Sequence, residues 1–207
     1  KFLNNKGWHL EKLVNLTSKI GSGATPRGGE KAYKESGIAL IRSMNVRDGL
    51  FKEKGLAYID DKQADALKNV QVKASDILLN ITGASVARVC RAPDKYNGAR
   101  VNQHVAIIRP VGHLKNLFLE YQLLNSSFKA KLLAGAGAGA TREAITKTDI
   151  EKTEIILPPI ELQDQFEDKI QQISNLEIQN WQSQEKINEL FISLQHKAFS
   201  GELSGAA

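Results

Sequence analysis

Leu157-Pro158-Pro159-Ile160 is the stretch that divides this chain of 207 residues into two parts. Before it the sequence is irregular and basic, and glycine and polar turns interrupt it; after it, Glu161 to Phe199 contains neither proline nor glycine. Proline is tolerated just before a helix or in its first turn, so the pair predicts where a helix begins. At about 1.5 Å per residue, a helix of that length extends about 55 Å. We therefore predict an arm or spacer.

The charge changes at the same boundary. Residues 1–110 hold 19 Lys and Arg against 10 Asp and Glu, a net charge of +9, whereas residues 161–207 hold 3 against 8, a net charge of −5. A basic domain makes a polyanion the first partner to consider, because Lys and Arg that neutralise phosphates release condensed counterions. Charge and layout favour nucleic acid over the alternative, a mildly basic surface without such a partner.

The composition places the chain among globular proteins. A hydrophobic content of 42% suffices for one domain or two small ones. The single cysteine, Cys90, excludes an intramolecular disulfide framework and lies in an apolar run, so we predict a buried thiol and a reducing, cytoplasmic setting. No stretch reaches the roughly eighteen consecutive apolar residues of a membrane span, and Lys1 to Lys6 lacks the apolar core of a signal peptide.

The first 157 residues predict a mainly β domain with short helices, and the chain as a whole an α+β protein with a second part at 158–207. Apolar spacing predicts one helix within Leu117 to Leu133, packed on the sheet, and a shorter one after Asp60 or Asp61. Turn dipeptides are expected at Asp48-Gly49 and Asn97-Gly98. The predicted strands are Ile38–Ile41, Leu56–Ile59, Asp76–Ile81, Val86–Cys90 and His104–Ile108.

The predicted long helix carries a 4,3 repeat with apolar ends and a polar centre. Such a seam predicts a coiled coil whose buried polar side chains penalise wrong registers. Trp181 flanks the polar centre and joins the seam if the repeat shifts by a stutter. The alternative is an amphipathic helix folded onto its own domain, but no second helix of matching length exists in the chain. The repeat runs through Phe166, Ile170, Ile173, Glu177, Asn180, Gln184, Ile187, Phe191, Leu194 and Ala198.

The common catalytic motifs are absent from the sequence. The four histidines show no metal-ligand spacing, and one cysteine cannot form a thiolate zinc site. The alternating Gly and Ala of residues 134–140 permit close approach to a phosphate, but the segment lacks the Gly-Lys-Ser/Thr ending of a P-loop. Leu157-Pro158-Pro159-Ile160 lacks the polar leader and the aromatic residue of an amino-methyltransferase motif. We predict no catalytic residue and no metal site.

Polar and basic residues that suit DNA recognition gather in three clusters and one basic loop. Their side chains can bind phosphates or read the edges of guanine and adenine, although a solvated turn or a local cap is the alternative for each one singly. The predicted DNA-binding residues are Arg27 and Lys31 in the loop, Arg42, Ser43, Asn45 and Arg47 in the first cluster, Arg100, Asn102 and Gln103 in the second, and Thr141, Arg142 and Lys147 in the third.

Taken together, these segments resemble half of a specificity subunit of a type I restriction-modification enzyme. The resemblance covers almost the whole chain, and it is most specific in the proline pair before a long helix and in the ending Ala198-Phe199-Ser200-Gly201-Glu202-Leu203. The other matching segments are Gly7-Trp8 with Lys12-Leu13, Ile20 to Pro26, Ile41 to Val46, Gly139 to Thr141 leading into Ile145 to Ile150, and Ile155 to Gln163.

The resemblance implies a particular architecture and function. By this resemblance, a full subunit has two target-recognition domains that two long antiparallel helices hold apart. Each domain is expected to read one half of a split sequence in double-stranded DNA. Such subunits are not catalysts: modification subunits supply adenine methylation with S-adenosylmethionine, and a restriction subunit supplies ATP-driven translocation and cleavage. We therefore expect no cofactor in this chain, with S-adenosylmethionine and ATP bound only by partner subunits.

This chain has one recognition domain and one helix, so two origins stay open. It is either a half-subunit that dimerises through the helix or a fragment of a longer chain. A two-fold dimer would read the same half-site twice, which predicts a palindromic, interrupted target. Two other functions remain as alternatives: a free-standing enzyme with a nucleotide at the Gly/Ala loop, and a coiled-coil adaptor.

Overall fold

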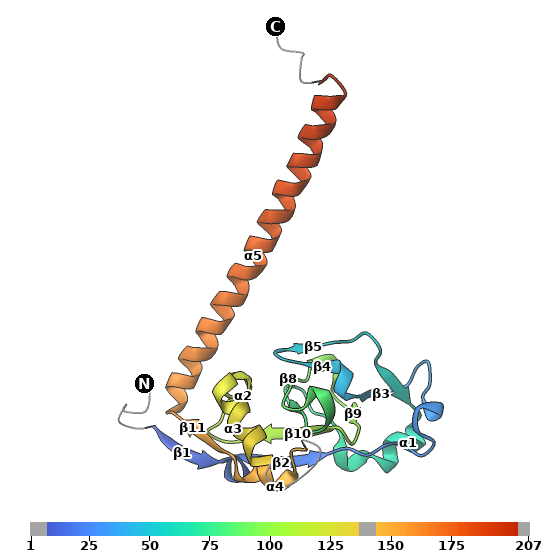
Figure 1. The fold of residues 1–207 in the computed structure, drawn as a ribbon, viewed down its shortest axis with the longest axis vertical. Helices are drawn as coiled ribbons and strands as arrows, with labels where there is room; N and C mark the ends of the chain where they lie inside the picture. Colours follow the sequence, from blue (N-terminus) through green and yellow to red (C-terminus); the bar gives the residue numbers. More distant parts are fainter. Residues whose placement is uncertain (1–7, 137–143, 203–207) are drawn as a thin grey trace. The chain divides into compact units, whose positions relative to one another are not determined.

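The computed structural model describes residues 8–136 and 144–202. It divides the chain into two compact units, the first ending at Gln163 and the second beginning at Asp164 (Figure 1). The proline pair predicts a boundary after Leu157. The first unit instead extends to Gln163 and so includes the first turn of the long helix.

The first unit is rich in short strands, as the sequence predicts. Its helices are α1 (Asp61–Ala66), α2 (Asn116–Leu124), α3 (Ser126–Ala136) and α4 (Lys147–Lys152). Its strands are β1 (His9–Lys12), β2 (Thr17–Ser22), β3 (Ile38–Ile41), β4 (Val46–Arg47), β5 (Leu50–Phe51), β6 (Ala57–Ile59), β7 (Ile77–Asn80), β8 (Val89–Arg91), β9 (Arg100–Val101), β10 (Val105–Pro110) and β11 (Glu154–Leu157).

A four-stranded antiparallel sheet in the order β2-β10-β7-β8 lies at the centre of this unit. A three-stranded sheet, β6-β3-β9, pairs β3 antiparallel with β6 and parallel with β9. Strands β1 and β11 form a separate antiparallel pair, and β4 and β5 form a hairpin (Figure 1). The β1–β11 pair joins the two ends of the unit, with His9 opposite Leu157.

The central sheet has an apolar core on each face, because successive side chains of a strand point to opposite sides. Ile77 and Leu79 of β7 pack in a core with residues of α2, α3 and α4, such as Leu119. Leu78, between them, packs in the other core with Leu40 of β3 and residues of β6. The first unit is therefore layered, with α2, α3 and α4 on one face of the central sheet, and the second sheet and α1 on the other.

Two local predictions need correction. The segment predicted as one helix forms α2 and α3, because Asn125 interrupts it: its Oδ1 accepts hydrogen bonds from the backbone N–H groups of Ser127 and Phe128 and so caps α3. The strand predicted from Val86 begins only at Val89, because Ala87 has a left-handed backbone with φ of 63°. Cys90 is buried, as predicted.

The predicted long helix is confirmed as α5 (Ile160–Phe199). Its start is fixed within the first unit by Gln163, whose side chain is fully buried. The Gln163 amide donates to the carbonyls of His113 at 2.8 Å and Pro158 at 3.0 Å, and its Oε1 accepts from the N–H of Lys115 at 2.9 Å. No described helix combines the length and apolar character that crossing a membrane requires.

Candidate nucleic-acid interface

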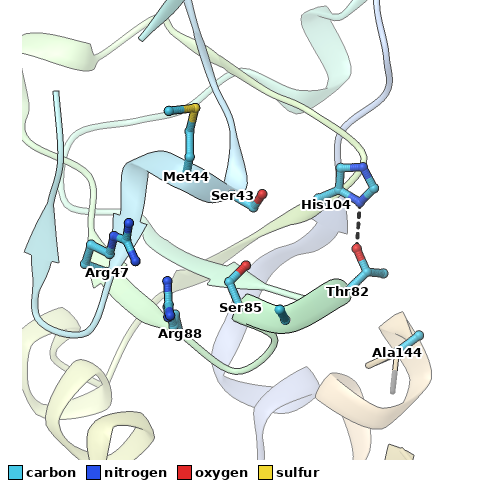
Figure 2. A pocket seen from close by; sticks show the side chains of 10 residues that line it. Ser43, Met44, Arg47, Thr82, Ser85, Arg88, His104 and Ala144 are labelled. Carbon is cyan, nitrogen blue, oxygen red and sulfur yellow. Dashed lines mark hydrogen bonds between the residues drawn. The ribbon is translucent and has the colours of Figure 1, made fainter. Parts of the chain in front are cut away.

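An open depression of about 970 Å³ lies on the first unit where several loops meet. Its walls come from the 3-10 turn η3 (Ser43–Asn45) with β4, from the turn η5 (Gly83–Ser85), and from the ends of β8 and β10. Figure 2 shows the labelled side chains around it. The lining residues are Ser43, Met44, Arg47, Thr82, Gly83, Ala84, Ser85, Arg88, His104 and Ala144.

Two buried asparagines hold the loops that form the depression. The amide of Asn80, at the end of β7, donates to the carbonyl of Ser43 at 2.9 Å and to Oγ of Ser85 at 3.0 Å, so it joins η3 to η5. The side chain of Asn45 accepts from the N–H of Arg42 at 2.9 Å and donates to the carbonyl of Lys52 at 2.9 Å. The loops are therefore fixed to the sheet before any partner binds.

Arg47 and Arg88 give the depression its charge. Both guanidinium groups line it (Figure 2), and within the described residues neither has an ion-pair or hydrogen-bond partner. Three other arginines of the same unit pair with carboxylates, namely Arg42, Arg91 and Arg109. Two uncompensated cations on one concave surface form a favourable site for an anion such as a phosphate group.

His104 is held in one orientation at the edge of the depression. Its Nδ1 lies 2.6 Å from Oγ1 of Thr82, and its Nε2 lies 2.9 Å from Nε2 of Gln103. With the Gln103 amide as donor to Nε2, the neutral ring carries its proton on Nδ1 and donates to Thr82. Thr82 also pairs through its backbone with Ala144. These polar groups are suited to hydrogen bonds with base edges or phosphates.

The structure brings together some of the predicted site residues. Ser43 and Arg47 line the depression, and Gln103 is exposed beside it. Arg27 and Lys31 are exposed in a separate loop that contains the turn η2 (Gly29–Ala32).

Two other predicted residues, Arg42 and Lys147, form ion pairs within the first unit. Arg42 donates to the carbonyl of Gly55 at 2.7 Å, pairs with Glu30 at 3.3 Å, and lies over the ring of Tyr33. Lys147, the first residue of α4, pairs with Glu151 one turn later at 3.4 Å. The remaining predicted residues, Thr141 and Arg142, lie outside the described residues.

Three of the predicted DNA-binding residues are buried. Asn45 has no exposed surface, and its amide bonds are satisfied internally as described above. Arg100 donates to the carbonyls of Ala64, Gly98 and Ala99, and burial lowers the pKa of its guanidinium. Asn102 accepts from the N–H of His104 at 3.1 Å. In this conformation these three side chains support the loops and do not line the depression.

Sequence reasoning missed the η5 side of the depression. Thr82, Ser85 and Arg88 follow a buried strand and surround Gly83, whose φ of 77° marks a sharp turn. The sequence does contain a signal for this side: a polar turn directly follows an apolar strand. Loops that a rigid scaffold holds in place often carry binding residues. Within the described residues, no three His, Cys, Asp or Glu side chains are grouped so as to hold a metal ion.

The predicted seam of α5 is largely exposed in the second unit. Ile173, Ile187, Phe191 and Leu194 are all more than half exposed. A second apolar line, formed by Ile178, Ile192 and Phe199, recurs at multiples of seven residues on another face of the helix and is also exposed. A single partner helix covers one such line. The helix thus presents two apolar faces.

Comparison with known proteins now defines the class. Residues 8–189 match the family described as the type I restriction modification DNA specificity domain. This chain therefore belongs to that family. It is 25% identical over 199 residues to the specificity subunit of the type I restriction enzyme EcoBI from Escherichia coli, a match that covers 94% of this chain and 41% of that subunit.

Solved structures agree with this fold. A chain from a structure described as showing complex assembly and conformational transition of the type I R-M system matches with a TM-score of 0.61 and 20% identity over 94% of this chain and 46% of that one. The HsdS subunit from Thermoanaerobacter tengcongensis matches with a TM-score of 0.57 and 22% identity over 81% of this chain and 38% of the subunit. The chain spans less than half the length of these relatives.

Proposed function

We propose that this chain recognises one half of a bipartite double-stranded DNA target through the depression at Arg47 and Arg88. The observation that carries the proposal is the pair of guanidinium groups without carboxylate partners among the described residues, on a rigid concave surface of a DNA specificity domain. Arginine binds phosphates and also reads the O6 and N7 acceptors of guanine with two hydrogen bonds.

The other lining side chains supply groups for base discrimination. The hydroxyls of Ser43 and Ser85 donate and accept, so they suit either a purine or a pyrimidine edge. Met44 is exposed at the rim and offers an apolar surface, which suits the methyl group of thymine. The arginines thus provide most of the affinity, while the neutral groups contribute to the choice of sequence.

Selection of duplexes from a random pool, followed by sequencing, tests this proposal. The full chain, with and without modification subunits, should enrich one short motif, and the variant with Arg47→Ala and Arg88→Ala should lose that enrichment. The slope of log affinity against log salt should become less steep by about 1.8, because two phosphate contacts are lost at about 0.9 each. Lys62→Ala, on exposed helix α1, is the matched control. No enriched motif under either condition would contradict the proposal.

We also infer that the exposed seam of α5 pairs antiparallel with the same helix of a second copy. The support is the row of exposed apolar side chains at Ile173, Ile187 and Phe191, with polar Asn180 midway along it. Two copies would read a palindromic, interrupted target. Sedimentation velocity at micromolar concentration should show a dimer that Ile187→Glu dissociates. A wild-type monomer would instead favour a fragment whose helix pairs with the other half of a longer chain.

The second apolar line of α5 supports docking of a modification subunit. We propose that Ile178, Ile192 and Phe199 form this docking face, and that the chain itself is not a catalyst. S-adenosylmethionine and ATP are then bound by the modification and restriction subunits. Ile192→Glu should prevent co-purification with the modification subunit while leaving the dimer intact. Methyl transfer to DNA, or nucleotide-dependent thermal stabilisation, by the chain alone would favour a free-standing enzyme.

A coiled-coil adaptor without DNA contact is the third candidate. It requires that substitution of the depression arginines leave every activity of the assembled complex unchanged. The arginine variant described above therefore separates it from DNA recognition. Among the described residues neither Arg47 nor Arg88 has an ion-pair partner, which favours DNA recognition.

A further inference from the structure

The β4–β5 hairpin presents an exposed leucine beside the basic depression. In its register Val46 lies opposite Phe51, and Arg47 lies opposite Leu50. Val46 is fully buried, whereas Leu50 is 63% exposed, the highest value for a large apolar side chain among the described residues of the first unit. Neighbouring pairs of a hairpin point to opposite faces, so Leu50 shares the outer face with Arg47.

Several contacts hold this hairpin rigid. Its turn is Asp48-Gly49, and the φ of Gly49 is 66°, which suits glycine. The N–H of Gly49 donates to the carbonyl of Val89 at 2.9 Å, and Oδ1 of Asp48 accepts from the N–H of Val89 at 3.2 Å. On β5, next to Leu50, the ring of Phe51 packs on the ring of Tyr96, with 4.9 Å between the ring centroids. Leu50 is therefore held on a fixed support.

The surroundings of Leu50 are cationic. Arg47, its cross-strand neighbour, lines the depression together with Arg88. The nearby carboxylate of Asp48 is neutralised by Lys129, whose Nζ lies 2.5 Å from Oδ1. Leu50 is thus an exposed apolar side chain on a rigid support, next to guanidinium groups without ion-pair partners among the described residues. This combination suits a polyanion in which an apolar interior lies close to the phosphates. Stacked bases of duplex DNA have that chemistry.

We propose that Leu50 inserts as an apolar wedge between two base pairs of the DNA held by Arg47 and Arg88. This inference rests on the proposed function, since it concerns the same depression. Inserted leucine side chains partly unstack a base step and bend the duplex, and Arg47 on the same hairpin face is placed to contact the adjacent backbone. The cost of unstacking is lowest at pyrimidine–purine steps, so the wedge adds sequence preference without a hydrogen bond to a base.

Fluorescence of 2-aminopurine tests the wedge. The base analogue is placed in turn at each adenine position of the duplex obtained by selection, and its fluorescence rises when it is unstacked. With the full wild-type chain, one step should brighten several-fold. Leu50→Ala should abolish the signal and weaken binding to the selected duplex about tenfold, while affinity for random DNA stays unchanged. Leu50→Met should keep most of the signal.

Two further variants separate the wedge from other roles. Leu50→Lys adds a cation, so it should strengthen binding to random DNA yet lose the fluorescence signal. Leu10→Ala, an exposed leucine of β1, should change neither. If the wild-type chain binds its selected duplex with no brightened step, or if Leu50→Ala leaves both affinity and signal unchanged, the wedge is excluded and DNA recognition stands. If Leu50→Ala weakens only assembly with another protein, the wedge is likewise excluded. If the wild-type chain selects no DNA, the proposed function fails first and the wedge with it.

Discussion

Arg109 of β10 and Asp76, the residue before β7, form a two-point ion pair: Nε lies 2.7 Å from Oδ1 and Nη2 lies 2.7 Å from Oδ2. The Asp76 side chain is only 1% exposed, and it also accepts a hydrogen bond from the N–H of Lys73. The guanidinium makes a third bond, to the carbonyl of Gln71. The pair thus ties the loop before β7 to the central sheet, whose far ends support the depression.

Removing one member of this pair should destabilise the domain strongly. Asp76→Ala leaves a mostly buried guanidinium without its counter-charge, so we expect the free energy of unfolding to fall by about 3 kcal/mol. Urea denaturation followed by circular dichroism measures it. Glu30→Gln, which removes the 83% exposed partner of Arg42, is the control and should change stability by less than about 0.5 kcal/mol. Equal effects of the two substitutions would show that burial of the pair is irrelevant.

Gln163 should be needed to fix the start of α5. Gln163→Ala leaves the carbonyls of His113 and Pro158 and the N–H of Lys115 without their partner, which should cost about 2–4 kcal/mol. The same variant should be cleaved faster by proteases near Pro158, because the helix start loses its attachment. Gln171→Ala, exposed two turns later, is the control. Unchanged cleavage in Gln163→Ala would mean that the apolar contacts suffice.

Cys90 should behave as an inert thiol in the folded protein. Burial, with a smaller contribution from the charge of Glu120, raises the pKa of Cys90 to about 12 from an ordinary value of 9.0. A thiol reagent at pH 8 should therefore label the chain only in denaturant. Because the unfolded chain ionises first, the stabilising effect is complete below pH 9 and is lost as the pH rises toward 12.

The pH dependence of stability checks this assignment. The difference in free energy of unfolding between wild type and Cys90→Ala should shrink by about 1.4 kcal/mol per pH unit above pH 9. Lysines and tyrosines titrate in the same range, but they do so in both proteins and cancel in the difference. A difference that stays constant from pH 8 to pH 11 would contradict a raised pKa.

Much of the fold follows from local sequence patterns, but its long-range pairings do not. The proline pair and the absence of glycine located α5, and short apolar runs bounded by glycine and polar turns located β3 and β7. The pairing of β1 with β11 joins residues at opposite ends of the unit, and no local pattern encodes such a partner. The break between α2 and α3 was readable in principle, since Asn125 is a favoured capping residue. The apolar spacing outweighed that signal in the prediction.

The candidate site was predicted only in part, because residue type does not reveal burial. Arg47 and Arg100 look equivalent in the sequence, yet one lines the depression and the other donates to three backbone carbonyls. Asn45 is predicted as a DNA-binding residue from its type, whereas in the structure its side chain is buried and bonds to the backbone of Arg42 and Lys52. Arg88 was missed because its position depends on the turn at Gly83, which brings η5 next to η3.

The polar centre of the α5 seam gives the last prediction. In an antiparallel pair related by a two-fold axis, Asn180 of each copy lies near the other, where buried amides favour one register at a cost in stability. Asn180→Ile should therefore raise the thermal stability of the dimer and also allow additional oligomers, which sedimentation velocity resolves. The length of the gap in the selected DNA target should become variable, because a shifted register changes the distance between the two recognition units. Gln182→Ile, on the face of the helix opposite the seam, should do neither. If Asn180→Ile leaves the oligomeric state and the gap unchanged, another part of the helix sets the register.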